Sequence, residues 1–203
     1  MPKLARAPDW SDAIVTEGGG VAATIVAIKR VRGPGRKPAK EQIAIRLRRA
    51  VHFVPGGNER MLTKSLTTEA DSLVLDLEDA VTPENKDSAR EIICSWLKDV
   101  DFGRHERMIR INPIDTPWFR ADMEATMVNP PDSYLVPKVS GAGDVRLVDR
   151  VVSELESRYG HEPGQVKLVV LGTETPRGFQ NIAEIPCVPR VDALSWGAED
   201  LSA

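Results

Sequence analysis

The 203-residue chain is 41% hydrophobic and 28% charged, a composition that supplies one sizeable core and excludes disorder throughout. Its longest apolar stretch, Val21 to Ile28 with only Thr24 polar, is far shorter than the roughly 20 residues of a membrane-spanning helix, which excludes a transmembrane protein. The net charge of −3 combines +7 over residues 1–50 (eleven basic, four acidic) with −10 over residues 51–203 (sixteen basic, twenty-six acidic).

Residues 1–48 are predicted to form a flexible basic segment. Gly18-Gly19-Gly20 interrupts it, and Arg30 to Lys40 mixes basic residues with Gly and Pro. A basic arm for nucleic acid or membrane is the alternative, but no aromatic residues are interleaved for base stacking. We therefore expect a solvated tail, with neither nucleic acid nor membrane as a partner.

The cysteines and the first residues point to the cytoplasm. Cys94 and Cys187 lie far apart, without a second Cys or a nearby His at metal-ligand spacing, which is typical of ordinary thiols in a reducing compartment. Asp9, Asp12 and Glu17 fall where a secretory or transit signal would be basic or apolar. A cytoplasmic protein is expected.

From residue 51 onward, short apolar runs alternate with amphipathic stretches. Runs of this length and composition predict buried strands. Their starts are about 21–35 residues apart, a spacing that suits successive strand–helix units. The predicted strands are 51–54, 72–77, 107–111, 133–138, 166–171 and 193–196.

Amphipathic helices are predicted between these strands. The first spans 60–69, with an apolar stripe that fades toward its end. In the second, Thr82 is the expected cap and Pro83 the first helical residue, and apolar residues recur as far as Leu97. Two more are predicted at 117–126 and 143–159. Trp118 and Trp196 are expected in the core.

This alternation favours a parallel α/β fold, because each connecting helix must cover the sheet that its flanking strands build. Polar residues gather after the strands, and in a TIM (β/α)₈ barrel these positions meet at one mouth, where active sites lie. The rival, a doubly wound open sheet, would be expected to carry a Gly-x-Gly-x-x-Gly turn or a phosphate loop, and neither is present. The barrel is expected to be incomplete, with about six of eight units, because the fold usually takes about 250 residues.

Two carboxylates follow neighbouring predicted strands. Glu174 comes after the apolar run 167–171, and Asp200 comes after 193–196. Carboxylates without His or Cys make a hard oxygen site that suits Mg²⁺ or Mn²⁺. From spacing alone the alternative stays open that Glu174 caps the next helix and Asp200 makes a loop hydrogen bond.

Arg110 lies inside an apolar predicted strand and must therefore meet an anion. Its partner is either a substrate or one of the acids Asp76, Glu78 and Asp79, which crowd into four positions. Strand alternation places Asp76 and Glu78 on one face, the interior of a barrel. Their mutual repulsion calls for a cation, which Arg110 or a metal would supply.

Six ordered segments resemble a known family. They are Arg49-Ala-Val-His-Phe-Val-Pro-Gly-Gly, Val74-Leu-Asp-Leu-Glu-Asp-Ala-Val, Arg110-Ile-Asn, Val136-Pro-Lys, Glu174-Thr-Pro-Arg-Gly and Trp196-Gly-Ala-Glu-Asp-Leu. Together they resemble the citrate lyase beta-subunit-like acyl-CoA lyases of the HpcH/HpaI aldolase superfamily, which include malyl-CoA and citramalyl-CoA lyases. The resemblance covers residues 49–203, which are predicted to be a partial TIM-barrel lyase domain.

The resemblance implies a magnesium-dependent carbon–carbon lyase. Glu174 and Asp200 would bind Mg²⁺ (or Mn²⁺), Arg110 and Glu174 would bind substrate, and Asp76 and Glu78 would support them. The substrate would be a 3-hydroxyacyl-CoA of the malyl, citramalyl or citryl type, cleaved to an acyl-CoA and a 2-oxo acid by a homo-oligomer, a trimer or hexamer when complete. Relatives continue for two more strand–helix units after the position of Asp200. The catalytic aspartate is expected there, so the catalytic residue is unknown.

Two other functions stay open. The chain is either a catalytically incomplete, truncated barrel, or a metal-dependent aldolase that acts on free 2-oxo acids. Metal-dependent release of acetyl-CoA or propionyl-CoA from malyl- or citramalyl-CoA would distinguish these possibilities from the lyase.

Overall fold

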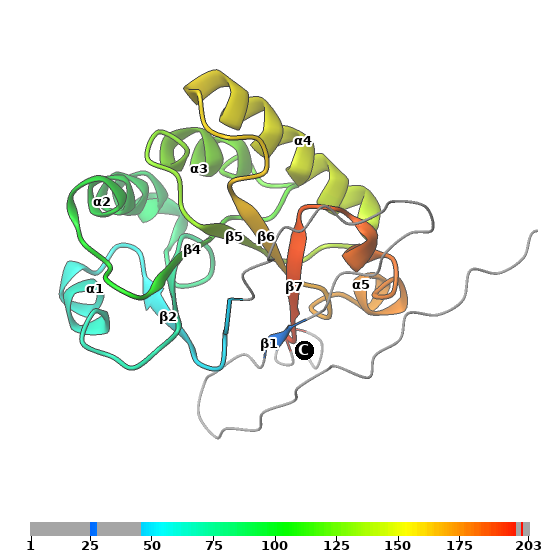
Figure 1. Cartoon of the computed structure of the whole chain (residues 1–203), viewed down its shortest axis with the longest axis horizontal. Coiled ribbons are helices and arrows are strands. Elements are labelled where there is room, and N and C mark those ends of the chain that lie inside the picture. Colours follow the sequence, from blue (N-terminus) through cyan, green and yellow to red (C-terminus); the bar gives the residue numbers. More distant parts are fainter. Residues whose placement is uncertain (1–24, 28–45, 198–199, 201–203) are drawn as a thin grey trace, which may run out of the picture.

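Six parallel strands, arranged side by side in chain order, form most of the sheet (Figure 1). The computed structural model describes residues 25–27, 46–197 and 200. The sheet order is β1-β7-β6-β5-β4-β3-β2, and only β1 (Ile25–Ala27) is antiparallel to its neighbour. The parallel strands are β2 (Val51–Pro55), β3 (Ser72–Asp76), β4 (Glu106–Arg110), β5 (Ser133–Val136), β6 (Lys167–Leu171) and β7 (Val191–Ser195). All six were predicted, with ends that differ by at most two residues.

The longer helices lie on the outer side of the curved sheet (Figure 1). Each connects two parallel strands, which requires a crossover and covers one face of the sheet. None in the described part of the chain is long and apolar enough to cross a membrane. The helices and 3₁₀ turns of the described residues are α1 (Glu59–Ser65), η1 (Pro83–Asn85), α2 (Lys86–Asp99), α3 (Phe119–Thr126), α4 (Ala142–Tyr159), α5 (Pro176–Gln180) and η2 (Ile185–Cys187).

Two helix boundaries differ from the prediction by three residues or more. Helix α1 ends at Ser65, because the Thr67 and Thr68 hydroxyls donate hydrogen bonds back to the carbonyls of Lys64 and Ser65 and draw the chain into turns. Helix α2 begins only at Lys86, after a 3₁₀ turn. Thr82 precedes that turn and makes no capping hydrogen bond with its side chain.

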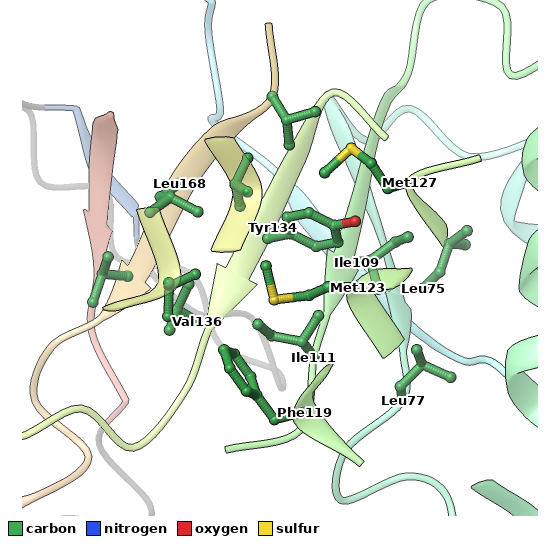
Figure 2. Packing of buried hydrophobic residues seen from close by; sticks show 14 of the residues in the cluster. Leu75, Leu77, Ile109, Ile111, Phe119, Met123, Met127, Tyr134, Val136 and Leu168 are labelled. Atoms are coloured by element: carbon green, nitrogen blue, oxygen red, sulfur yellow. The ribbon is translucent and has the colours of Figure 1, made fainter. Parts of the chain in front are cut away.

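The outward face of the sheet packs on the helices and holds the main core (Figure 2). In Figure 2, Ile109 lies beside Met123 of α3 and the ring of Tyr134, and Leu75 of the neighbouring strand lies on the other side of Ile109. The Tyr134 hydroxyl reaches the Thr126 hydroxyl at 2.8 Å, so this buried polar atom is paired.

The inward face carries a smaller apolar cluster between two polar ends. Its members are Val51, Val74, Met108, Leu135, Val169, Leu171 and Ala193. At the amino ends of the strands, buried Glu106 accepts two 2.7 Å hydrogen bonds from Arg48 and one each from Ser72 and Ser133. This paired charge closes one end of the interior, and the candidate site lies at the other.

The sheet is curved but not closed. Within the described residues, β2 pairs only with β3. Strand β7 pairs with β6 on one side and with the antiparallel β1 on the other, so β7 and β2 do not meet. Strand β1 was not anticipated, because it falls in the segment predicted to be a flexible tail. The rest of that predicted segment, apart from residues 46–48, lies outside the described residues.

Candidate active site

The candidate site lies at the carboxyl ends of the parallel strands, where successive strands deliver charged side chains. Asp76 ends β3, with Glu78 just after it, and Arg110 ends β4. Lys138 and Glu174 follow β5 and β6. Because parallel strands end on the same side of a sheet, residues far apart in the sequence meet there.

Arg110 and Asp76 form a two-pronged ion pair across neighbouring strands. Arg110 Nε lies 2.8 Å from Asp76 Oδ1, and Nη2 lies 2.6 Å from Oδ2. The register places the two residues opposite each other. The guanidinium carbon also lies 5.2 Å from the centre of the Phe53 ring, within cation–π range. The guanidinium is therefore held along one edge by Asp76 and on one face by Phe53.

Glu78 lies between two cations. Its Oε2 is 2.9 Å from Arg110 Nη1 and its Oε1 is 2.7 Å from Lys138 Nζ. Neither oxygen has a partner with hydrogen-bond geometry, although the side chain is only 3% exposed. Burial raises the pKa of the Glu78 carboxyl, against the opposing effect of Arg110. The group is thus held by charge more than by directed hydrogen bonds.

Lys138 joins two parts of the site. Its ammonium group contacts Glu78 and lies 3.3 Å from Asp79, while its backbone N–H donates a 2.7 Å hydrogen bond to Glu174 Oε2. The residue has φ +52°, a left-handed conformation that is unfavourable for a side chain with a Cβ. This turn after β5 directs the N–H toward β6. Although burial alone lowers the pKa of Lys138, its contacts with Glu78 and Asp79 raise it overall.

Glu174 is the most perturbed carboxyl of the site. It is 7% exposed, and burial raises its pKa to about 7, with the charges of Glu78 and Asp200 acting in the same direction. It does not cap the next helix, because the Thr175 hydroxyl accepts the capping hydrogen bond from the N–H of Gly178. Gly197 lies against it, and a Cβ built there would be only 2.4 Å from Glu174 Cγ.

A second layer of polar groups holds the loop after β3. Lys86 is 5% exposed and donates 2.7 and 2.8 Å hydrogen bonds to the carbonyls of Leu77 and Glu78. Asn112 donates to the Leu77 carbonyl and to the carboxylate of Asp122. These contacts fix the backbone that carries Glu78. The sequence analysis assigned no role to Lys86 or Asp122. The signal that could have indicated their burial is a charged residue at a position next to the apolar face of an amphipathic helix.

The predicted site residues thus fall into one region. Asp76, Glu78 and Arg110 are in direct contact, and Glu174 joins them through Lys138. Asp200 is exposed, and its charge acts on Glu174. The role of Lys138 was missed, although the residue lies in one of the six segments that resemble the family.

Trp196 is not in the core as predicted. It is 46% exposed and meets Phe179 edge to face, with ring centres 6.2 Å apart. Trp118 is half-buried, and its ring lies 5.2 Å from the Lys86 ammonium group. Both indoles flank the site and do not fill the apolar interior.

A cleft of about 670 Å³ lies at the opposite end of the strands. It is lined by residues near the strand starts, among them Arg46, Arg107 and Asp132. The Arg46 and Arg107 guanidinium groups both pair with Asp132. None of the candidate site residues lines this cleft, so the cleft is separate from the candidate site.

A parallel, incompletely closed barrel with a carboxylate-rich site at its strand ends defines the class of this protein. Residues 49–203 match the family described as HpcH/HpaI aldolase/citrate lyase, and the chain belongs to that family. The resemblance seen in the six sequence segments is confirmed, and with it the fold class of an incomplete TIM-type barrel.

Individual relatives agree. The chain is 37% identical over 154 residues to a (3S)-malyl-CoA thioesterase of Cereibacter sphaeroides, covering 76% of this chain and 50% of that protein. It is 35% identical over 156 residues to a citrate lyase subunit beta of Leuconostoc mesenteroides subsp. cremoris, covering 76% and 51%. The chain thus spans about half the length of the curated relatives it matches.

A solved structure is also similar. It is a citrate lyase beta subunit from M. tuberculosis complexed with oxaloacetate and magnesium. The TM-score is 0.56 at 27% sequence identity, and the match covers 74% of this chain and 58% of that one.

Proposed function

We propose that this chain carries the metal ligands and the substrate-binding arginine of a magnesium-dependent carbon–carbon lyase. The substrate would be a 3-hydroxyacyl-CoA of the malyl, citramalyl or citryl type, and the products an acyl-CoA and a 2-oxo acid. The observation that carries the proposal is the buried Glu174 carboxyl. Burial raises its pKa to about 7, and the negative charges of Glu78 and Asp200 act in the same direction. Membership of a family with citrate lyase beta subunits, one of them solved with oxaloacetate and magnesium, supports it.

The charges around Glu174 fit a divalent cation. The region holds five carboxylates and three cations, an excess of two negative charges; the carboxylates are Asp76, Glu78, Asp79, Glu174 and Asp200, and the cations are Lys86, Arg110 and Lys138. In the described residues no three His, Cys, Asp or Glu side chains are grouped as a metal site. Mg²⁺ commonly binds through one or two carboxylates together with water and substrate, so Glu174 and Asp200 suffice as its protein ligands.

The chain's own residues would bind and orient the substrate. A bound Mg²⁺ would act as a Lewis acid on the oxo group of the 2-oxo acid. Asp76 fixes two N–H groups of Arg110, which leaves the Nη1 end beside Glu78 and the mouth of the barrel. That end would hold a carboxylate or the enolate oxygen of the thioester. Glu78 and Lys138 would keep Arg110 and Glu174 in place, and none of these groups is proposed to carry the proton.

Metal binding is tested by isothermal titration calorimetry of Mg²⁺ with Glu174→Gln. The neutral amide is a poor ligand for Mg²⁺, so the variant is expected to lose measurable binding. Glu154→Gln is the matched control, since Glu154 is exposed on α4 and far from the site in sequence and in contacts. Mg²⁺ affinity that is the same in wild type and Glu174→Gln would refute the assignment.

The reaction is tested by following acetyl-CoA or propionyl-CoA release from malyl-CoA or citramalyl-CoA with and without Mg²⁺. Release that needs Mg²⁺ and disappears in Glu174→Gln supports the lyase. Mg²⁺-dependent aldol cleavage of free 2-oxo acids alone would favour an aldolase. Mg²⁺ and oxo acid binding without any turnover would favour a catalytically incomplete barrel. The expected homo-oligomer stays a prediction, which light scattering tests.

A further inference from the structure

Ser195 carries a buried hydroxyl that has no hydrogen-bond partner among the residues that the structure describes. It is the last residue of β7 and is 3% exposed. Ala193 belongs to the inward cluster and Leu194 to the outward core, so strand alternation places Ser195 on the inward face. Its partner in register is Leu171, which also faces inward.

Other hydroxyls on this face are paired. Ser72 and Ser133 both donate to Glu106 at the amino ends of the strands. Thr173, just above Leu171, accepts a hydrogen bond from the N–H of Gly197. A buried hydroxyl without a partner destabilises a fold, so the exception at Ser195 requires an explanation.

The position of Ser195 supplies one. Gly197, two residues further along the same strand direction, lies against Glu174, and Leu171, opposite Ser195, is three residues before Glu174. Ser195 therefore lies next to the candidate site on the inward face of β7, two residues before Gly197 and closer to the amino ends of the strands than Glu174. Its inward neighbours Leu171 and Ala193 have no polar side-chain atoms, so their side chains offer no support for an ordered water, which needs two to four polar partners.

We propose that the Ser195 hydroxyl is a ligand-binding group that donates a hydrogen bond to a carboxylate oxygen of the bound 2-oxo acid. This inference rests on the proposed function. For this hydrogen bond to form, a carboxylate oxygen of the small 2-oxo acid must reach between the strand ends to the buried Ser195 Oγ. Ser195 would thus select for an oxygen-bearing group at the deep end of the ligand.

The test compares Ser195→Ala with Ser133→Ala. Both positions are buried serines on the inward face, but within the described part of the chain only Ser133 has a hydrogen-bond partner. Without ligand, Ser195→Ala is expected to melt at the same or a higher temperature than wild type, because the change removes an unpaired polar atom. Ser133→Ala is expected to melt lower. With Mg²⁺ present, oxaloacetate is expected to bind about fivefold more weakly to Ser195→Ala, as for the loss of one hydrogen bond, and equally well to Ser133→Ala.

The outcomes separate this inference from the proposed function. If wild type binds oxaloacetate and Ser195→Ala binds it equally well, the role of Ser195 is refuted and the proposed function stands. If Ser195→Ala melts well below wild type or fails to fold, the hydroxyl has a structural partner and the inference is also refuted. If wild type does not bind oxaloacetate with Mg²⁺, the proposed function fails, and the role of Ser195 fails with it.

Discussion

Gly197 faces Glu174 at a distance that leaves no room for a side chain. We predict that Gly197→Ala disrupts the site without any change of charge. The added Cβ would lie 2.4 Å from Glu174 Cγ and 3.2 Å from its Cδ and Oε1. Carbon atoms in contact are about 3.5–4.0 Å apart, so Glu174 or the chain at 197 must move by about 1 Å or more.

The magnitude follows from what that movement breaks. Glu174 Oε2 accepts the Lys138 N–H at 2.7 Å, and a shift of about 1 Å takes this pair beyond hydrogen-bond distance. Overpacking a buried site costs typically 1–3 kcal/mol, and losing a hydrogen bond to a charged group costs a similar amount. We expect the free energy of unfolding to fall by about 3 kcal/mol. Because Gly197 does not have a positive φ, the effect is steric and not conformational.

The assay is urea unfolding followed by circular dichroism, together with Mg²⁺ calorimetry. Gly143→Ala is the matched control, because Gly143 lies in the first turn of α4 and an added Cβ there meets nothing within 4 Å. That control is expected to be neutral or stabilising by up to about 1 kcal/mol. Gly197→Ala with wild-type stability and wild-type Mg²⁺ affinity would show that the loop yields freely and that the close approach does not position Glu174.

Two further predictions concern ion pairs. Arg110→Met leaves Asp76 buried without its cation and is expected to lower the free energy of unfolding by about 3–5 kcal/mol, measured by urea unfolding; a loss below about 1 kcal/mol would contradict the importance of the pair. Asp71 accepts hydrogen bonds from the guanidinium and backbone of Arg49, and the guanidinium lowers the pKa of its carboxyl from 3.8 to about 2. A lowered pKa stabilises the fold above pH 4, and this contribution is lost as pH falls toward 2. Asp71→Asn is therefore expected to cost about 1 kcal/mol at pH 7, after allowance for the exposure of Arg49, and the difference from wild type should shrink in urea unfolding as pH is lowered from 4. A difference that is constant with pH would contradict the assigned pair.

The strands could be predicted because burial on both faces makes them continuous apolar runs. The runs that begin at Ser72 and Ser133 mark the observed strand starts without error. Helix ends were harder, because side-chain hydrogen bonds such as those of Thr67 and Thr68 decide them. Strand β1 could not be predicted, since it has only three residues and its partner, β7, is more than 160 positions away.

The residues of the candidate site could be predicted, but the contacts that connect them could not. Strand alternation alone placed Asp76 and Glu78 on one face with Arg110 available to both. The link from Arg110 to Glu174 depends on the backbone of Lys138, whose left-handed turn has no signal in a Val-Pro-Lys sequence. Likewise, the apolar character of Trp196 predicts a core position. Strand β7 ends at Ser195, however, and the Trp196 ring lies at the surface beside Phe179.

Lys138 also explains how so many like charges stay together. Its side chain neutralises Glu78 and its backbone N–H holds Glu174, so one residue restrains carboxylates from the loops after β3 and β6. The strain of its positive φ is of the order of 1 kcal/mol, smaller than the repulsion that two unrestrained buried carboxylates would suffer. A glycine at this position would relieve the strain but lose the ammonium group. The left-handed conformation is therefore retained with a lysine, because both its main chain and its side chain are used.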